Sequence, residues 1–415
     1  MSVYLKEFST HSEYEAYIES EGKVLPNVSI CDDTKDVHYN PWVLETRVVA
    51  KFNVTDASNP TKIANGTSIF SEIEIDGVKQ TSVTTGYTFD TVGEHTVKYT
   101  LTDPTSIGES AFDFCQRITS VTIPNSVTNI GNNAFGWCIS LTSITIPDSV
   151  TSIDYGAFSG CIGLTSIDIP SGVTSIGTNA FNRCSGLTSV TVNSNNTVYD
   201  SRNNCNAIIE TSTNILIRGC KNTVIPDSVT SIGRAAFNGC ISLTSIVIPD
   251  SVTSIGAGAF TNCSGFTSIN IPSGVTSIGR EAFFGCERLR SIEIPDGITS
   301  IDTSTFADCR GLTSCTIGNG VTSIGDYAFS SCGRLTGITI PDSVTSIGSG
   351  AFHYCRSLTS IVSNATTAPT IQNTTFRFVN TGGTLRVPSG SSGYDAWMGT
   401  GEYYLGYYNW TRVEQ

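Results

Sequence analysis

Apolar and polar positions alternate in short runs along most of the chain, and the same runs return at a fixed interval. In "LTSITI" (141–146), leucine and isoleucine alternate with threonine and serine, a pattern typical of a half-buried β-strand. Pro147 ends that run because it has no N–H to donate, and Asp148 and Ser149 favour a turn. "VTSIG" predicts a second short extended segment. "AFxxC" is too short for a stable helix and predicts a single turn.

The unit "LTSIxIPDSVTSIGxxAFxxCxx" recurs every 23 residues. Its phenylalanine keeps this spacing except for one step of 56 residues, from Phe181 to Phe237. One coil cannot bury its apolar face alone, whereas stacked coils bury it against one another. The pattern therefore predicts a mainly β solenoid of ten 23-residue coils, with a core column formed by Phe112, Phe135, Phe158, Phe181, Phe237, Phe260, Phe283, Phe306, Phe329 and Phe352.

Residues 105–362 resemble the BspA-like (Treponema-type) leucine-rich repeat family. The 23-residue period, the pattern "IPxSVTSIGxxAFxxCxxLTSI" and the spacing from phenylalanine to cysteine carry this resemblance. It implies a leucine-rich repeat solenoid with a parallel sheet on one face. It also implies a role in adhesion or recognition, often at the surfaces of gut and oral microbes, and no enzyme activity.

The parts outside the regular repeat predict three further units. Residues 43–104 are strand-like, with Asp76-Gly77 at a hairpin turn, and predict a small β-sandwich-like (Ig-like) domain that also covers the first coil. In the long step, "NAIIE" and "NILIRG" predict a β-hairpin insert at 193–225 that interrupts the surface and can bend it. We favour a structural role for it over a ligand-contacting protrusion. Residues 363–415 predict a C-terminal cap, and "GTLRVPSGSSGYDAWMG" resembles segments that close such solenoids.

Residues 1–42 are expected to form an N-terminal tail or anchor. They show a weaker resemblance to leader segments of gut-phage structural proteins, which implies attachment to a virion structural protein. The first twenty residues lack the basic region and apolar run of a signal peptide, so classical secretion is not expected if Met1 is the true start. No run of eighteen apolar residues occurs, so membrane insertion is not expected either.

The net charge and the motifs limit the kinds of partner and reaction that we expect. The net charge of −13 disfavours nucleic acid and anionic lipid as partners. The sequence has neither a GxSxG nucleophile motif nor a glycine-rich phosphate loop. It also has no CxxC pair or Cys/His cluster with metal-ligand spacing. We therefore predict no catalytic residues, no metal and no cofactor.

Cysteine occupies one repeat position in all ten copies. A small buried residue suits this position, so a column of free thiols is expected from Cys115, Cys138, Cys161, Cys184, Cys240, Cys263, Cys286, Cys309, Cys332 and Cys355. Cys205 and Cys220 flank the predicted hairpin and are the best candidates for a disulfide.

Two groups of side chains are candidate ligand contacts. A basic stripe just after the cysteine column could hold acidic glycans or carboxylates of a partner, although an ordinary solvated face is the alternative. It comprises Arg288, Arg290, Arg310, Arg334 and Arg356. An aromatic group near the C-terminus could stack sugars, although packing of the cap is favoured. It comprises Tyr403, Tyr404, Tyr407, Tyr408 and Trp410.

The favoured function is non-enzymatic display and adhesion through binding of a host-surface glycan or protein. The first hypothesis is a phage virion component held by residues 1–42. The second is a bacterial cell-surface adhesin of the BspA-like type, and the third is a structural spacer without a ligand. Oligomerisation is compatible with such an extended chain, although no coiled-coil heptads support it.

Overall fold

Most regular coils contribute one strand to each of two parallel ladders. The "LTSIxI" run forms the longer ladder, in which β12 (Ser166–Ile169) pairs with β14 (Ser189–Val192). The "TSI" run forms the shorter ladder, in which β11 (Ser152–Ile153) pairs with β9 (Asn129–Ile130) and with β13 (Ser175–Ile176). The partners are 23 residues apart in every one of these pairs, so both predicted extended segments are confirmed.

The computed structural model describes residues 47–372 and 374–415. The remaining strands of the longer ladder are β8 (Ile118–Thr122), β10 (Ser143–Thr145), β21 (Ser291–Ile294), β23 (Ser314–Ile317), β25 (Gly337–Ile340), β27 (Ser360–Ser363), β29 (Thr384–Val387) and β30 (Thr411–Glu414). Those of the shorter ladder are β7 (Ser106–Ile107), β18 (Ser231–Ile232), β19 (Ser254–Ile255), β20 (Ser277–Ile278), β22 (Ser300–Ile301), β24 (Ser323–Ile324), β26 (Ser346–Ile347) and β28 (Thr370–Ile371). The predicted tail, residues 1–42, lies outside the described residues.

The "AFxxC" segment is a turn, as predicted. The residues two positions before and two positions after the phenylalanine adopt the left-handed conformation, for example Asn133 (φ 49°) and Trp137 (φ 53°) around Phe135. The turn segments also hydrogen-bond from coil to coil: Phe135 N–H donates to Ala157 O at 2.8 Å. The turns therefore form a third backbone ladder on either side of the insert.

The phenylalanine column forms the centre of the core. Neighbouring rings stack nearly parallel, and the pair Phe135–Phe158 is typical, with a centroid separation of 5.4 Å and an interplanar angle of 2°. The column continues past the tenth predicted ring, because Phe376 stacks on Phe352 at 5.8 Å. The repeat thus runs beyond residue 362, the predicted end of the solenoid. Trp397, 5.3 Å from Phe376, ends the column.

The N-terminal region is not a separate sandwich. Its main strands, β1 (Arg47–Val54), β6 (Gly93–Leu101), β3 (Phe70–Ile75) and β4 (Val78–Lys79), form an antiparallel sheet, and β1 pairs antiparallel with β8 of the first coil. A small two-stranded sheet joins β2 (Thr61–Lys62) to β5 (Gly86–Tyr87). Pairing with β1 covers the edge that β8 would otherwise expose, so the region covers the first coil as predicted.

The C-terminal cap extends the sheet face. β29 pairs parallel with β27, and β30 pairs parallel with β29. Two short 3₁₀ helices, η2 (Tyr394–Ala396) and η3 (Leu405–Tyr408), lie between them in the chain. The cap therefore closes the end of the solenoid by adding strands to the longer ladder and aromatic rings to the core.

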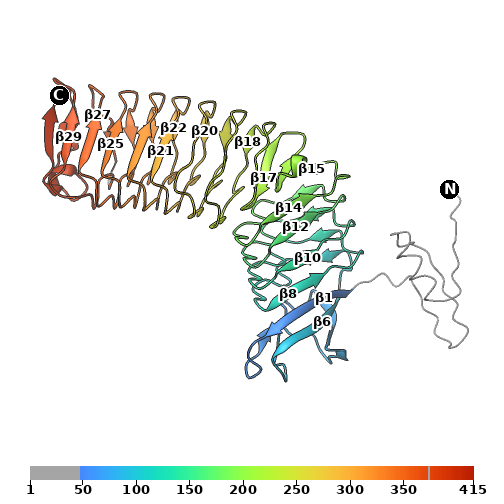
Figure 1. Ribbon diagram of the computed structural model, residues 1–415. Helices are drawn as coiled ribbons and strands as arrows, with labels where there is room; N and C mark the ends of the chain where they lie inside the picture. The colour runs from blue at the N-terminus through green and yellow to red at the C-terminus, as the bar shows by residue number, and fades with distance from the viewer. Residues whose placement is uncertain (1–46, 373) are drawn as a thin grey trace, which may run out of the picture.

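The predicted insert is a hairpin, and the solenoid bends where it lies (Figure 1). β16 (Ala207–Glu210) pairs antiparallel with β17 (Ile215–Gly219) and with β15 (Tyr199–Asp200). β17 also pairs parallel with β18, so it takes the place of a coil in the shorter ladder. The longer ladder stops at β14 and regains paired strands at β21. We call the coils before the insert the N-terminal arm and those after it the C-terminal arm.

Candidate functional site

The sheet face of the N-terminal arm contains a shallow hollow of about 630 Å³. Its floor is formed by the exposed side chains that point outward from β8, β10, β12 and β14, which are Thr122, Thr145, Asp168 and Thr191. Thr191 Oγ1 donates a hydrogen bond to Asp168 Oδ1. Apolar side chains such as Pro147 and Pro170 lie beside this row, and its hydroxyl and carboxylate oxygens can accept from a ligand that carries hydroxyl or amide donors.

A second hollow lies on the sheet face of the C-terminal arm, with a volume of about 310 Å³. Asn270, Glu293 and Thr316 occupy the same repeat position there as Thr145 does in the first arm. Between the hollows, Val247 holds that position with 83% of its surface exposed, in a segment without a paired strand. The sheet face is thus divided into two separate surfaces by the bend.

The predicted arginine stripe does not form one column. Arg310 and Arg356 directly follow the cysteine of their coils, whereas Arg288 and Arg334 lie one residue later. Arg290 lies directly before β21, at the edge of the sheet face. All five side chains are exposed, but they alternate between neighbouring rows.

The charge of this surface is also partly neutralised. Arg310 Nη1 lies 3.6 Å from Glu287 Oε1, and its Nη2 lies 3.3 Å from Asp308 Oδ1. The Arg356 guanidinium lies 5.1 Å above the ring of Tyr354. The local basic stripe is therefore spread over two rows, and two acids lie beside Arg310; binding of an acidic ligand by these arginines stays a prediction.

The predicted aromatic platform is only partly exposed. Trp410 and Tyr408 are 5% and 8% exposed, and Trp410 Nε1 donates to Asn380 O at 2.8 Å. Tyr403 and Tyr404 are half-buried, and Tyr407 is exposed. The favoured prediction, packing of the cap, is therefore confirmed for Trp410 and Tyr408, because the end of the core needs an apolar cover, and sugar stacking does not apply to these two rings. Sugar stacking by Tyr403, Tyr404 and Tyr407 stays a prediction.

A cluster of rings at the turns near the C-terminus was missed from the sequence. Tyr354 stacks on Phe378 with centroids 4.7 Å apart, and the Arg377 guanidinium lies 4.8 Å from the Phe378 ring and 5.5 Å from that of Tyr403. Burial and the neighbouring Arg377 lower the pKa of His353, which contacts the same rings. Both stacked rings lie two positions after a core phenylalanine, and this spacing is the signal that could have revealed the cluster.

The column cysteines are free and buried, as predicted. Each thiol after the first of an arm points to the preceding coil: Cys309 Sγ lies 3.2 Å from Phe283 O and donates to it. Cys205 and Cys220 are free as well, so the suggested disulfide is not formed. Cys220 Sγ instead donates to Asn206 O at 3.5 Å, and the two thiols belong to different core clusters on either side of the hairpin.

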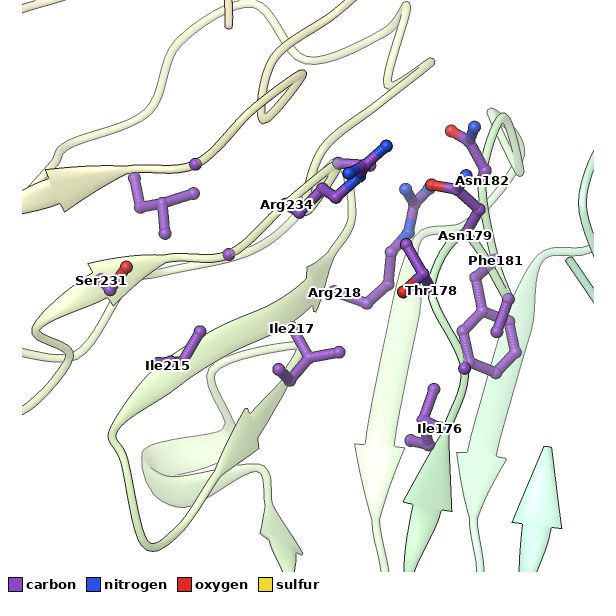
Figure 2. A pocket seen from close by; sticks show the side chains of 16 residues that line it. Ile176, Thr178, Asn179, Phe181, Asn182, Ile215, Ile217, Arg218, Ser231 and Arg234 are labelled. Atoms are coloured by element: carbon purple, nitrogen blue, oxygen red, sulfur yellow. The ribbon is translucent and has the colours of Figure 1, made fainter. Parts of the chain in front are cut away.

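The bend opens a cleft of about 330 Å³ between the turn of the last coil of the N-terminal arm and the strands β17 and β18 (Figure 2). Figure 2 shows the side chains of Arg218 and Arg234 pointing toward the segment that carries Thr178 and Asn182. Ile176, Ile215 and Ile217 line the other part of the cleft. Sequence reasoning did not find this cleft, because it arises where the repeat is interrupted.

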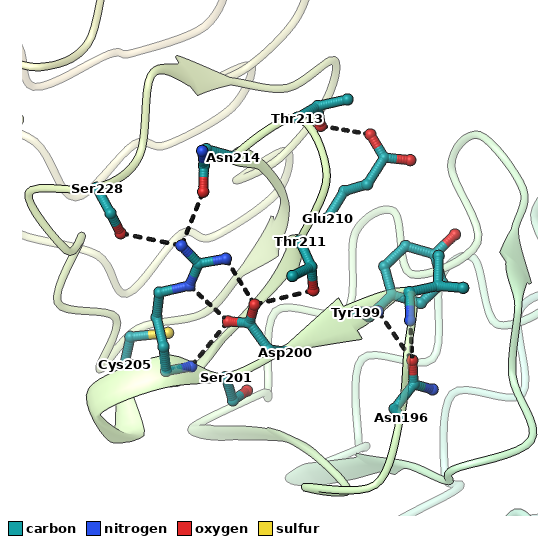
Figure 3. Close-up of polar contacts among 12 residues, drawn as sticks. Asn196, Tyr199, Asp200, Ser201, Cys205, Glu210, Thr211, Thr213, Asn214 and Ser228 are labelled. Atoms are coloured by element: carbon teal, nitrogen blue, oxygen red, sulfur yellow. Dashed lines mark hydrogen bonds and ion pairs between the residues drawn. The ribbon is translucent and has the colours of Figure 1, made fainter.

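The polar groups of the insert contact one another (Figure 3). Arg202 Nη2 lies 2.6 Å from Asp200 Oδ2, and Arg202 Nη1 donates to Asn214 Oδ1 at 2.7 Å. Thr211 Oγ1 also donates to Asp200. Burial opposes ionisation of Asp200, but hydrogen bonds from Arg202 outweigh it and lower the pKa of this carboxyl. These groups are engaged within the insert, which favours its structural role over a protrusion that contacts a ligand.

No three His, Cys, Asp or Glu side chains in residues 47–372 and 374–415 gather in a way that could hold a metal ion. Over the same ranges, no helix has the length and apolar character needed to cross a membrane.

A family profile described as "BspA type Leucine rich repeat region (6 copies)" matches residues 105–217, 207–317 and 254–381. The chain belongs to this family. The matched region spans both arms and includes the coil of Phe376. No curated protein shows a significant match to the chain.

Several solved structures are similar to this BspA-type chain. A leucine-rich cell surface protein from Faecalibacterium prausnitzii is 37% identical, with 61% of each chain covered and a TM-score of 0.46. The chain therefore spans less than two thirds of that protein. A leucine-rich repeat protein from Eubacterium ventriosum is 28% identical over 60% of this chain and 80% of that one, with a TM-score of 0.46. The pneumococcal vaccine antigen PcpA is 18% identical over 75% of this chain and 71% of that one, with a TM-score of 0.50, and it shows a shared fold.

Proposed function

We propose that this chain is a non-enzymatic adhesion scaffold that holds a host-surface glycan or protein against the sheet face of its N-terminal arm. The observation that carries the proposal is the hollow over β8, β10, β12 and β14, where exposed Thr122, Thr145, Asp168 and Thr191 form one row. Adjacent strands are about 4.8 Å apart, so the row offers regularly spaced hydrogen-bonding groups to an extended ligand that crosses several coils.

Membership of the BspA-type family supports this role, since the resemblance implies adhesion and recognition. A bacterial cell surface is the location that we propose first. Display on a phage virion is the alternative, and it depends on residues 1–42, which lie outside the described residues. Mass spectrometry of purified phage particles and of the envelope fraction of the host culture separates the two locations.

The binding proposal is tested with the full chain on a glycan array and on immobilised mucin and matrix proteins. We expect Thr145→Arg to weaken the best interaction at least tenfold, because it places a bulky cation in the centre of the hollow. Thr316→Arg is the matched control, since Thr316 holds the same repeat position in the C-terminal arm. Absence of any ligand, or equal binding by the wild type and both variants, would favour a structural spacer.

A further inference from the structure

The cleft at the bend lies where the solenoid lacks a complete coil. In a regular position of the shorter ladder, the isoleucine is covered by the next coil, and Ile153 is fully buried. Ile176 of β13 has no following strand and is half-buried, as are Ile215 and Ile217 on the opposite wall. The interruption therefore leaves an apolar surface between two walls that the core clusters of the two arms hold in place.

Two backbone donors also lose their usual acceptors at this point. In a regular turn, the phenylalanine N–H donates to the alanine carbonyl of the next coil. Here Ala236 O accepts from Gly219 N at 2.9 Å instead. Within the described chain, the N–H groups of Phe181 and Asn179 consequently have no hydrogen-bond partner, and both residues line the cleft.

Arg218 places a buried positive charge at the same end of the cleft. The residue is 3% exposed, and its guanidinium donates to Asn238 O at 3.2 Å and lies 3.8 Å from Cys240 Sγ. Its Nε has no partner among the described residues, and no carboxylate there lies within ion-pair distance of the guanidinium. A buried charge without a counter-charge is costly, so an anion in the cleft would be stabilising.

The lining of the cleft adds to this positive potential. Arg234 points into the same region as Arg218 (Figure 2). The lining includes no Asp or Glu, although the chain as a whole carries a net charge of −13. The charge of the cleft is thus opposite to that of the rest of the molecule, as expected of a site that selects an anion.

We propose that this cleft binds a carboxylate that carries an aliphatic or aromatic group. The carboxylate lies against Arg218 and Arg234 and accepts from the free N–H groups of Asn179 and Phe181, while the apolar group lies on the three isoleucines. A free organic acid and the C-terminus of a polypeptide share this chemistry. The volume of about 330 Å³ fits a ligand of the size of one or two residues.

The proposal is tested by calorimetric titration of the full chain with N-acetyl-leucine, N-acetyl-leucinamide and acetate. The amide keeps the apolar group without the charge, and acetate keeps the charge without the apolar group. We expect N-acetyl-leucine to bind at least tenfold more tightly than either. The proposal would be overturned if N-acetyl-leucinamide or acetate bound as tightly as N-acetyl-leucine, or if N-acetyl-leucine did not bind.

A pair of matched variants locates the site. Arg234 and Arg280 are exposed and hold the same repeat position, three residues before Phe237 and Phe283, but only Arg234 lines the cleft. Arg234→Gln should weaken N-acetyl-leucine about fivefold or more, because a charge-assisted contact is lost. Arg280→Gln should leave the affinity unchanged. Equal effects of the two variants would point to a general charge effect and refute the site.

Arg218→Met removes the buried charge and should abolish binding in a chain that keeps its far-ultraviolet circular dichroism. If this variant does not fold, the Arg234 and Arg280 pair still decides the proposal. The source of the ligand is distinguished with the peptide Gly-Ser-Leu. Tighter binding of the peptide than of N-acetyl-leucine indicates a polypeptide C-terminus, and equal binding indicates a free acid.

Discussion

Gly219 lies directly against the ring of Phe237. A Cβ atom built on Gly219 would come within 2.2 Å of Phe237 Cε1 and 2.5 Å of Cζ. In the regular part of the column, that face of the ring is covered by the phenylalanine of the preceding coil. Here the backbone of β17 covers it, and only glycine allows so close an approach. This contact allows the C-terminal arm to begin its own column next to the insert.

Gly219→Ala is therefore expected to destabilise the start of the C-terminal arm. The added methyl group forces the Phe237 ring to move, which is overpacking and costs about 1–3 kcal/mol. The measurement is the free energy of unfolding in urea. Gly333→Ala is the control, because a Cβ at Gly333 meets nothing within 4 Å. A Gly219→Ala chain as stable as the control would contradict the contact.

The two arms are expected to lose stability separately. Their buried residues form two core clusters that meet at the insert. Phe158→Ala removes one stacked ring from the N-terminal arm and should cost about 3–5 kcal/mol. Hydrogen exchange should then accelerate in residues 105–192 and remain slow in residues 250–362. Phe114→Ala, at an exposed ring, serves as the mild control. Equal acceleration in both arms would show that they unfold as one unit.

The column thiols should not react in the folded chain. Burial raises the pKa of Cys184, Cys309 and Cys355 to about 12, so almost no thiolate is present at pH 8. Treatment with iodoacetamide at pH 8, followed by peptide mass spectrometry, should find these three unmodified. The same treatment in urea should modify them all. Rapid labelling without urea would mean that the coils open readily.

His95, in β6, is expected to make the N-terminal sheet sensitive to pH. Burial acts to lower the pKa of His95, but hydrogen bonds to Asp76 and to the Thr91 carbonyl outweigh it, and the pKa is raised. The stabilisation by the protonated ring is therefore complete below the unfolded pKa of about 6.5 and is lost as the pH rises through the higher folded value. The difference in urea midpoint between wild type and His95→Gln should shrink between pH 5.5 and pH 8.5. A constant difference would exclude this titration.

Periodic features of the fold follow from the sequence. Positions such as Phe135 and Ile153 recur at 23 residues, and each makes the same contact in every regular coil, so one local reading applies many times. The hairpin of β16 and β17 was also predictable, since its two apolar runs are separated by a short polar turn. All of these features are determined by contacts between adjacent coils or between residues close in sequence.

Features that depend on a single non-repeated contact were not predictable. The pairing of β1 with β8 joins segments about seventy residues apart and merges the expected separate domain with the solenoid. The offset between Arg310 and Arg334, which differ by one residue in repeat position, is itself visible in the sequence. The burial of Trp410, by contrast, was the favoured prediction, because the end of a solenoid core needs a cover. The cleft could not be predicted, because the sequence does not show which strand takes the place of a coil.

The substitution of β17 for a coil has a consequence for how such a protein can change in length. Adding or deleting a 23-residue unit in either arm would lengthen or shorten that arm by about 4.8 Å. The junction would remain intact if the two flanking coils are kept, because β17 pairs with β18 on one side and Ile217 packs against the core of the N-terminal arm on the other. The insert would then hold a fixed bend, while the length of each arm could change independently of the other. Reach can vary between relatives while the angle and the cleft stay the same.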